Sequence, residues 1–430
     1  MKPDGGRVTL GNRQDRAPIS GTGMRKVSVS SMSDTPAIRL TRDAKRLVSL
    51  GQALSRSGSR LEDIYWEDQL AQLITKMLGG KKSKTLENVL DFLLADDINV
   101  YEILVEQAET CSESLVISRG SADHDVLLVS APIVAWTRYR LPDGKLTAAQ
   151  SEALKVALAE TVAAEGASIA MLPNLITFDQ MPQTFQETRL WTQRLGALAL
   201  GTSTEACPVR DPADTEGMLA DARFAVAAIA VPRGEPVFRW QNPDAPAVEG
   251  RDLAQQAWAD RVQAVVGTLF TGCHMEVLLP DAYYTTNREA DRRIRPMALR
   301  AAVTWLQTAA NLPGSELRAA IAACGTNGVE EFRIGFTPRT SNDVIYGCVW
   351  PVLSKEEAVI DGVESAVVDV PESVAALLKE LGVAEVRRLP GIHAAEFCED
   401  CGAPYFPNFL GEMMHPELPD ETDMEPMHFH

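Results

Sequence analysis

The sequence is poor in cysteine, lacks any long apolar run and has no recognisable export signal. Seven cysteines in 430 residues are too few, and odd in number, for a secreted disulfide scaffold, so a reducing cytoplasm is the expected compartment. A membrane span needs roughly 18 uncharged apolar residues, and the purest run, Phe224 to Pro232, is half that length. The N-terminal basic residues have no apolar block behind them, so no secretory signal is expected.

Basic side chains are also in short supply, with 41 Lys and Arg against 59 Asp and Glu and a net charge of −18. Such a surface repels phosphate backbones and anionic lipids, so we expect neither a nucleic-acid partner nor a membrane partner. The sequence also lacks the motifs G-x-x-x-x-G-K-[ST], H-E-x-x-H and G-x-S-x-G, and no strand leads into a G-x-G-x-x-G. Nucleotide cofactors and the common hydrolase sites therefore lose support.

What remains is an ordinary globular composition, 45% apolar and 23% charged. At roughly 150 residues per domain, the length predicts about three structural units. Residues 1–40 are rich in Gly, Ser and Arg and carry seven basic against three acidic residues, which predicts a disordered leader. Residues 41–112 repeat apolar positions every three or four residues, and Ser59 to Glu62 forms a capping-box sequence, so this part predicts a packed helical region.

After the helical region, apolar strands alternate with Ala-rich helices, which is typical of a parallel α/β fold. We predict three related β-α-β units, at 113–222, at 223–330 and, shortened, at 331–395. Proline cannot donate to a sheet ladder, so a proline is expected to close each strand. The first strands of the three units end at Pro132, Pro232 and Pro351, and the second strands at Leu-Pro pairs that contain Pro173, Pro280 and Pro390.

The tail, residues 396–430, is predicted to form a turn held together by a metal ion. This turn replaces a last helix that the third unit lacks. Cys398 and Cys401 stand three apart and Gly402 follows, which is the pattern of a knuckle that presents two thiolates to a structural zinc ion. His428 and His430 are two residues apart and face one side of an extended chain, so they are the expected remaining ligands. His415 is the alternative histidine.

Two other interpretations of the tail remain open, a redox or ligand-free thiol pair and an open catalytic metal. The sequence Gly402-Ala403-Pro404 disfavours the helix that usually follows a redox C-x-x-C. Residues 390–430 contain nine acidic side chains and no Lys or Arg. We expect these charges to raise the thiol pKa values when no metal is bound and to attract Zn²⁺.

A second candidate site is an arginine-rich loop at residues 281–296, which follows a predicted strand end and leads to a helix that Pro296 is expected to open. In parallel α/β sheets, ligands bind outside such ends, and tyrosine and arginine there would suit a small anion. The alternative is a solvated turn held by the ion pairs Glu289–Arg293 and Asp291–Arg295. The candidate ligand-binding residues are Tyr283, Tyr284, Arg288, Arg292, Arg293 and Arg295.

Several segments resemble an uncharacterised family found mainly in betaproteobacteria. They include Leu279–Tyr284, Arg288–Pro296, Phe332–Arg339, Asp343–Gly347, Cys398–Pro404, the helix from Asp43 and the terminal His-Phe-His. The resemblance covers roughly residues 40 to 430 and implies a cytoplasmic bacterial protein. It transfers no activity and no catalytic residue.

These observations predict a cytoplasmic, zinc-binding α/β protein that is not an enzyme and acts through contacts with a protein or a small ligand. The alternative is an enzyme or sensor for a small anionic metabolite held by the arginine-rich segment.

Overall fold

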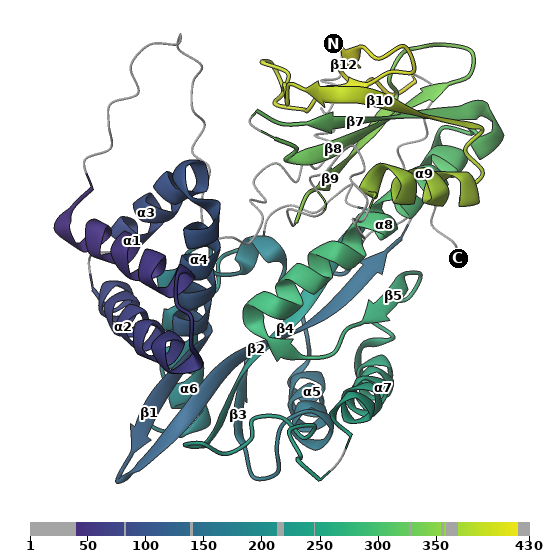
Figure 1. Ribbon diagram of the computed structural model, residues 1–430. Coiled ribbons are helices and arrows are strands. Elements are labelled where there is room, and N and C mark those ends of the chain that lie inside the picture. The colour runs from purple at the N-terminus through teal and green to yellow at the C-terminus, as the bar shows by residue number, and fades with distance from the viewer. Residues whose placement is uncertain are drawn as a thin grey trace, which may run out of the picture.

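The computed structural model describes residues 40–80, 83–137, 141–212, 219–244, 246–326, 328–353, 357 and 369–419. The predicted leader therefore lies outside the described residues, apart from its last position. The described chain has mixed α and β structure with a helical N-terminal region, a first sheet and a second sheet, and the long helix α8 runs from one sheet to the other (Figure 1).

The helical region consists of α1 (Arg42–Ser55), α2 (Arg60–Leu78), α3 (Ser83–Asp96) and α4 (Ile98–Glu113). Its boundaries follow local capping signals, because the Ser59 hydroxyl accepts from the Glu62 N–H and the Asp97 carboxylate accepts from the Val100 N–H. Gly51 allows α1 to approach α4, since a Cβ there would lie 2.8 Å from Val100 Cγ1. The predicted helical region is confirmed.

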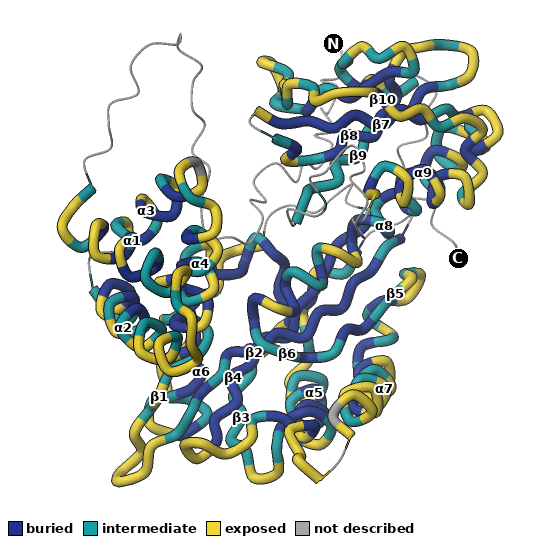
Figure 2. Tube along the Cα trace, in the orientation of Figure 1, coloured by how far each residue is buried: buried dark blue, intermediate teal, exposed yellow. Residues whose placement is uncertain are grey.

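The first sheet contains β1 (Ser114–Arg119), β2 (Ala122–Trp136), β3 (Ser168–Met171), β4 (Ala220–Pro232), β5 (His274–Val277) and β6 (Asp281–Ala282). Its order is β1-β2-β4-β3, and β5 and β6 pair with β2 beside β1. Helices α5 (Ala148–Thr161) and α7 (Ala247–Val266) pack on one face. Helices α4, α6 (Phe185–Ala199) and the first half of α8 (Tyr283–Ala309) cover the other face. Figure 2 shows β2 and β4 buried between these layers.

The prediction of a parallel sheet is wrong, because all neighbouring strands in this sheet are antiparallel. In the unit β2-α5-β3 the two strands do run in the same direction, but β4 lies between them. In the unit β4-α7-β5, β2 lies between the two strands in the same way. The first two predicted units are thus split β-α-β units, each of which inserts a strand into the other.

Pro132 does not close a strand, since β2 continues through it to Trp136. The Pro132 carbonyl accepts from the Leu278 N–H at 2.9 Å, on the side where the strand paired with β2 changes from β6 to β5. The missing N–H therefore falls at a break in the ladder. Pro232 and Pro351 do end strands, while Pro390 lies inside β10 at an irregularity between Arg388 and Ile392.

The second sheet contains β7 (Leu317–Cys324), β8 (Glu331–Pro338), β9 (Tyr346–Pro351) and β10 (Glu385–His393) in the order β10-β7-β8-β9. Only β10 and β7 are parallel. The second half of α8 and helix α9 (Val370–Glu380) pack on one face. The strands of the third predicted unit, β9 and β10, lie at opposite edges of this separate sheet, so the prediction of three related copies is not confirmed.

The tail covers the opposite face of the second sheet through the short hairpin of β11 (Phe406–Pro407) and β12 (Met413–Met414) (Figure 1). Glycines in β8 and β9 permit this close approach. A Cβ at Gly335 would collide with the Pro407 carbonyl, and one at Gly347 would collide with the Phe406 ring. The tail is therefore seated directly on the backbone of the sheet.

Candidate metal centre

Cys398 and Cys401 lie in a tight turn whose two flanks pair through an antiparallel bridge between Phe397 and Pro404. The Cys398 N–H donates to the Ala403 carbonyl at 2.7 Å, and the Gly402 N–H donates to the Cys398 carbonyl at 2.9 Å. Gly402 has φ +72°, a left-handed conformation that favours glycine. We call this turn, residues 397–404, the knuckle.

The structure brings three soft donors together at the knuckle. Sulfur atoms of Cys398 and Cys401 and a ring nitrogen of His415 all lie within 4.8 Å of one another. Cys401 Sγ and His415 Nε2 are 3.1 Å apart. His415 directly follows β12, so the pairing of β12 with β11 returns it to the knuckle. Two thiols and an imidazole are the donor types of protein zinc sites.

The turn itself favours the metal-binding form of Cys398. The backbone N–H groups of Cys401 and Asp400 point at the sulfur and lower the pKa of this thiol, and the nearby Asp400 carboxylate opposes them more weakly. Asp400 therefore acts in the direction expected of the acidic tail, but the net pKa of Cys398 is lowered and not raised. The reason is that backbone N–H groups donate directly to the sulfur and outweigh the nearby carboxylate.

The structure brings part of the predicted ligand set together. Among the residues that the structure describes, the two cysteines lie together and His415, the alternative histidine, lies beside them. His428 and His430 lie outside the described residues. Between residues 396 and 419, all of which are described, the chain contains short strands and turns and no helix, as predicted.

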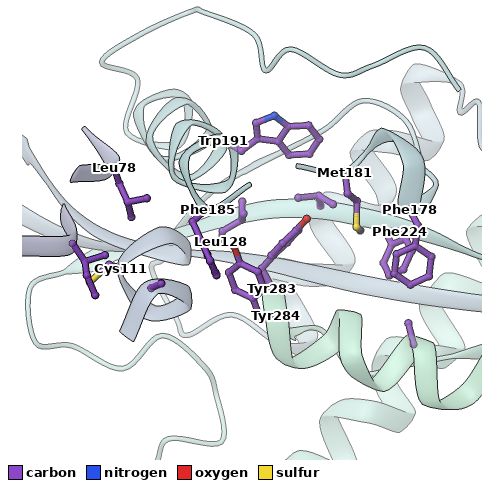
Figure 3. Close-up of a cluster of buried hydrophobic side chains, with 14 of the residues drawn as sticks. Leu78, Cys111, Leu128, Phe178, Met181, Phe185, Trp191, Phe224, Tyr283 and Tyr284 are labelled. Atoms are coloured by element: carbon purple, nitrogen blue, oxygen red, sulfur yellow. The ribbon is translucent and has the colours of Figure 1, made fainter. Parts of the chain in front are cut away.

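The arginine-rich segment is not a loop. Residues 283–295 form the first half of α8, and Pro296 lies inside the helix that it was expected to open. Tyr283 and Tyr284 are 1% and 4% exposed and pack against Phe185 and other core side chains (Figure 3). The Tyr284 hydroxyl pairs with the Thr188 hydroxyl at 2.9 Å. Neither tyrosine forms an exposed wall for a ligand.

The arginines of this segment are engaged by carboxylates. Arg288 pairs with Glu109 at 2.6 Å, Arg292 and Arg293 with Glu289 at 3.5 and 2.8 Å, and Arg295 with Glu357 at 2.8 Å. The predicted pair Glu289–Arg293 is confirmed, which favours the ion-pair interpretation. Two hollows on the described surface, of about 460 and 200 Å³, are lined by none of the six candidate residues.

A partly buried carboxylate, Glu113, caps the start of α8. Its Oε2 accepts from the Tyr284 N–H at 2.9 Å, and it supplies the side-chain cap that the N-cap residue, Ala282, lacks. Burial raises the pKa of Glu113 from its ordinary 4.5 to about 7, and the Glu109 carboxylate adds to the effect, while the Tyr284 N–H and Arg288 oppose it. No local pattern indicated this cap, since Glu113 and Tyr284 are 171 residues apart along the chain.

Glu113→Gln is expected to remove a pH dependence of stability. The raised pKa means that protonated Glu113 stabilises the fold fully below pH 4.5, and that this stabilisation is lost as the pH rises through about 7. Glutamine keeps the acceptor for Tyr284 and carries no charge. The variant should therefore be more stable than the unchanged protein at pH 8, by about 1–3 kcal/mol, and the difference should fall below about 1 kcal/mol at pH 5.

Urea unfolding at pH 5 and pH 8 checks this expectation, with Glu106→Gln, an exposed position on the same helix, as the control. Equal stabilities of Glu113→Gln and the unchanged protein at pH 8 would refute the assigned role.

Comparison with known proteins finds a family that the chain matches. The family model described as "Protein of unknown function (DUF2863)" matches residues 32–429. No curated protein matches the chain, and no solved structure does. Within the described residues, none of the helices combines the length and the apolar character that crossing a membrane requires.

Proposed function

We propose that this chain, which belongs to the family described as proteins of unknown function (DUF2863), binds one zinc ion through Cys398, Cys401 and His415. The convergence of two sulfurs and one ring nitrogen within 4.8 Å carries the proposal. Thiolates and imidazole favour zinc over magnesium or calcium, which prefer oxygen ligands. The lowered pKa of Cys398 supports the same conclusion, because the thiolate is the form that binds metal.

The role of the zinc ion in this proposal is structural, and the protein acts through contacts rather than catalysis. Structural zinc sites use four protein ligands, so a fourth is needed. We assign it to His428 or His430. His428 follows His415 by 13 residues, and a chain of that length reaches up to about 40 Å when extended. The cytoplasm remains the compartment that we propose, because it keeps thiols reduced.

The alternative of an anion-binding enzyme or sensor receives no support from the arginine-rich segment, because its tyrosines are buried and its arginines pair with carboxylates. We therefore favour the zinc-binding function alone.

Metal analysis of the full chain, purified without an affinity tag, tests the proposal. We expect about one zinc ion per chain, and less than about half an equivalent in Cys398→Ser and in His415→Ala. Cys273→Ser, which removes a half-buried thiol directly before β5 of the first sheet, is the control and should keep its zinc. Simultaneous replacement of His428 and His430 by alanine tests the fourth ligand. Little zinc in the unchanged protein, with no further loss in Cys398→Ser, would refute the site.

A further inference from the structure

Arg333 on β8 is a fully buried arginine that hydrogen-bonds to the backbone on both sides of the knuckle. Its side chain is 0% exposed. Its Nη1 donates to the Glu396 carbonyl at 2.5 Å and to the Tyr405 carbonyl at 2.8 Å. These two carbonyls stand on either side of the knuckle, and the Tyr405 N–H also donates to the Glu396 carbonyl at 3.1 Å. The guanidinium of Arg333 therefore links the two chain segments that enter and leave the turn.

The orientation of this guanidinium is fixed from two further sides. Its carbon lies 4.7 Å from the centre of the Phe397 ring, and Phe397 directly precedes Cys398. Its Nε donates to Glu331 Oε1 at 2.7 Å, from two residues earlier on the same strand. The flat fork of arginine donates to two acceptors and stacks on an aromatic ring at the same time, which a lysine ammonium cannot do.

The same strand also seats the hairpin that carries the third donor. Gly335, two residues after Arg333, lies against Pro407 of β11, and β11 pairs with β12, which immediately precedes His415. β8 therefore fixes both the base of the cysteine turn and the hairpin that brings the histidine to it. The same strand therefore contributes to the placement of both the thiols and the imidazole.

We infer that Arg333 is a positioning residue of the metal centre, which holds Cys398 and Cys401 in the arrangement that the ion requires. This inference rests on the proposed zinc-binding function. A preformed site binds more tightly because less chain has to be ordered when the ion arrives. Groups that orient metal ligands typically change metal affinity by about 10–100-fold when they are replaced.

Zinc affinity, measured on the full chain by competition with a chromophoric chelator, tests the inference. Arg333→Met should bind zinc about 10–100-fold more weakly, and Arg333→Lys should fall between it and the unchanged protein. The matched control is Arg387→Met. Arg387 on β10 also donates from the second sheet to a tail carbonyl, that of Phe409 at 2.6 Å, but beyond the knuckle. The control should change the affinity by less than about threefold.

Cobalt binding adds a measurement that a loss of folding alone would not mimic. Once saturated, Arg333→Met should show the thiolate-to-cobalt absorption of the unchanged protein, because both cysteines remain, but it should need more cobalt to reach saturation. If Arg333→Met does not fold, Phe397→Leu replaces it. This variant removes only the stacking ring, 45% exposed, and should weaken zinc binding several-fold.

The outcomes separate the inference from the proposed function. Wild-type zinc affinity in the folded Arg333 variants, or in Phe397→Leu where Arg333→Met does not fold, would overturn the inference and leave the zinc site standing. An equal loss in Arg387→Met would also overturn it, since any tail contact would then suffice. An unchanged protein that binds neither zinc nor cobalt would overturn both.

Discussion

Asp221→Ala is expected to lower the free energy of unfolding by about 3–5 kcal/mol, because it leaves a buried guanidinium without its counter-charge. Asp221 and Arg223 are two residues apart on β4, so both side chains lie on one face of the strand. Their side chains are 0% and 2% exposed, and Asp221 Oδ2 accepts from Arg223 Nη1 at 2.7 Å. Arg223 Nε also donates to the Pro142 carbonyl at 2.8 Å, but a carbonyl carries no net charge.

Urea unfolding of Asp221→Ala measures this effect. The exposed pair Arg339–Glu385 provides the control, since Glu385→Ala should cost no more than about 1 kcal/mol. Replacement of both members, as Asp221→Ala with Arg223→Leu, should recover much of the loss, because no unpaired charge is then buried. A loss below about 1 kcal/mol in Asp221→Ala would show that water reaches Arg223.

Gly335→Ala is expected to cost about 1–3 kcal/mol and to loosen the tail from the second sheet. The new Cβ would collide with the carbonyl oxygen of Pro407, a backbone atom that cannot rotate away. The tail must move, or β8 must distort, and both lose packing. Gly328→Ala, between β7 and β8 of the same sheet, is the control because nothing lies within 4 Å of a Cβ placed there.

Unfolding midpoints and limited proteolysis of the tail together measure the effect of Gly335→Ala. We expect a lower midpoint and faster cleavage within residues 395–419, with Gly328→Ala unchanged in both. If the two glycine variants behave alike, the tail is not seated on β8 as described.

Local sequence signals predicted the helical region, because the residues that define each helix are close together along the chain. The apolar spacing in α1 and the Ser59 cap act over one helical turn, and the structure confirms both. The order of strands and helices after the helical region could also be predicted from the sequence. The pairing of the strands could not be predicted, because β2 pairs with β4, about 100 residues away, and both strands are buried on both faces. Such continuous apolar runs are typical of parallel sheets.

The arginine-rich segment was misread because Pro296 suggested that a helix begins there. The helix begins at Tyr283, and burial at Tyr283, Asn287, Ala290 and Ile294 follows the three- and four-residue spacing of a helical face. The pair Glu289–Arg293 was a further helical signal. Proline inside a helix removes one backbone hydrogen bond, and the packing of this face on the first sheet outweighs that loss.

At the candidate metal centre, the sequence identified the two cysteines of the turn but offered His415 only as an alternative, and His415 is the histidine that lies beside them in the described part of the chain. Cys398, Cys401 and Gly402 form a local motif. The choice of His415 depends on the β11–β12 hairpin and its seat on Gly335 and Gly347, which no spacing rule reveals. Arg333 was missed for the same reason, since its partners are carbonyls 63 and 72 residues further along the chain.

X-ray absorption at the zinc edge, on the full chain loaded with one zinc ion, tests the assignment of ligands most directly. The proposal predicts a first shell that contains two sulfur atoms at about 2.3 Å and nitrogen at about 2.0–2.1 Å. Cys398→Ser should lose at least one of the sulfur contributions. A first shell of oxygen and nitrogen alone would contradict the assignment of Cys398 and Cys401 as zinc ligands.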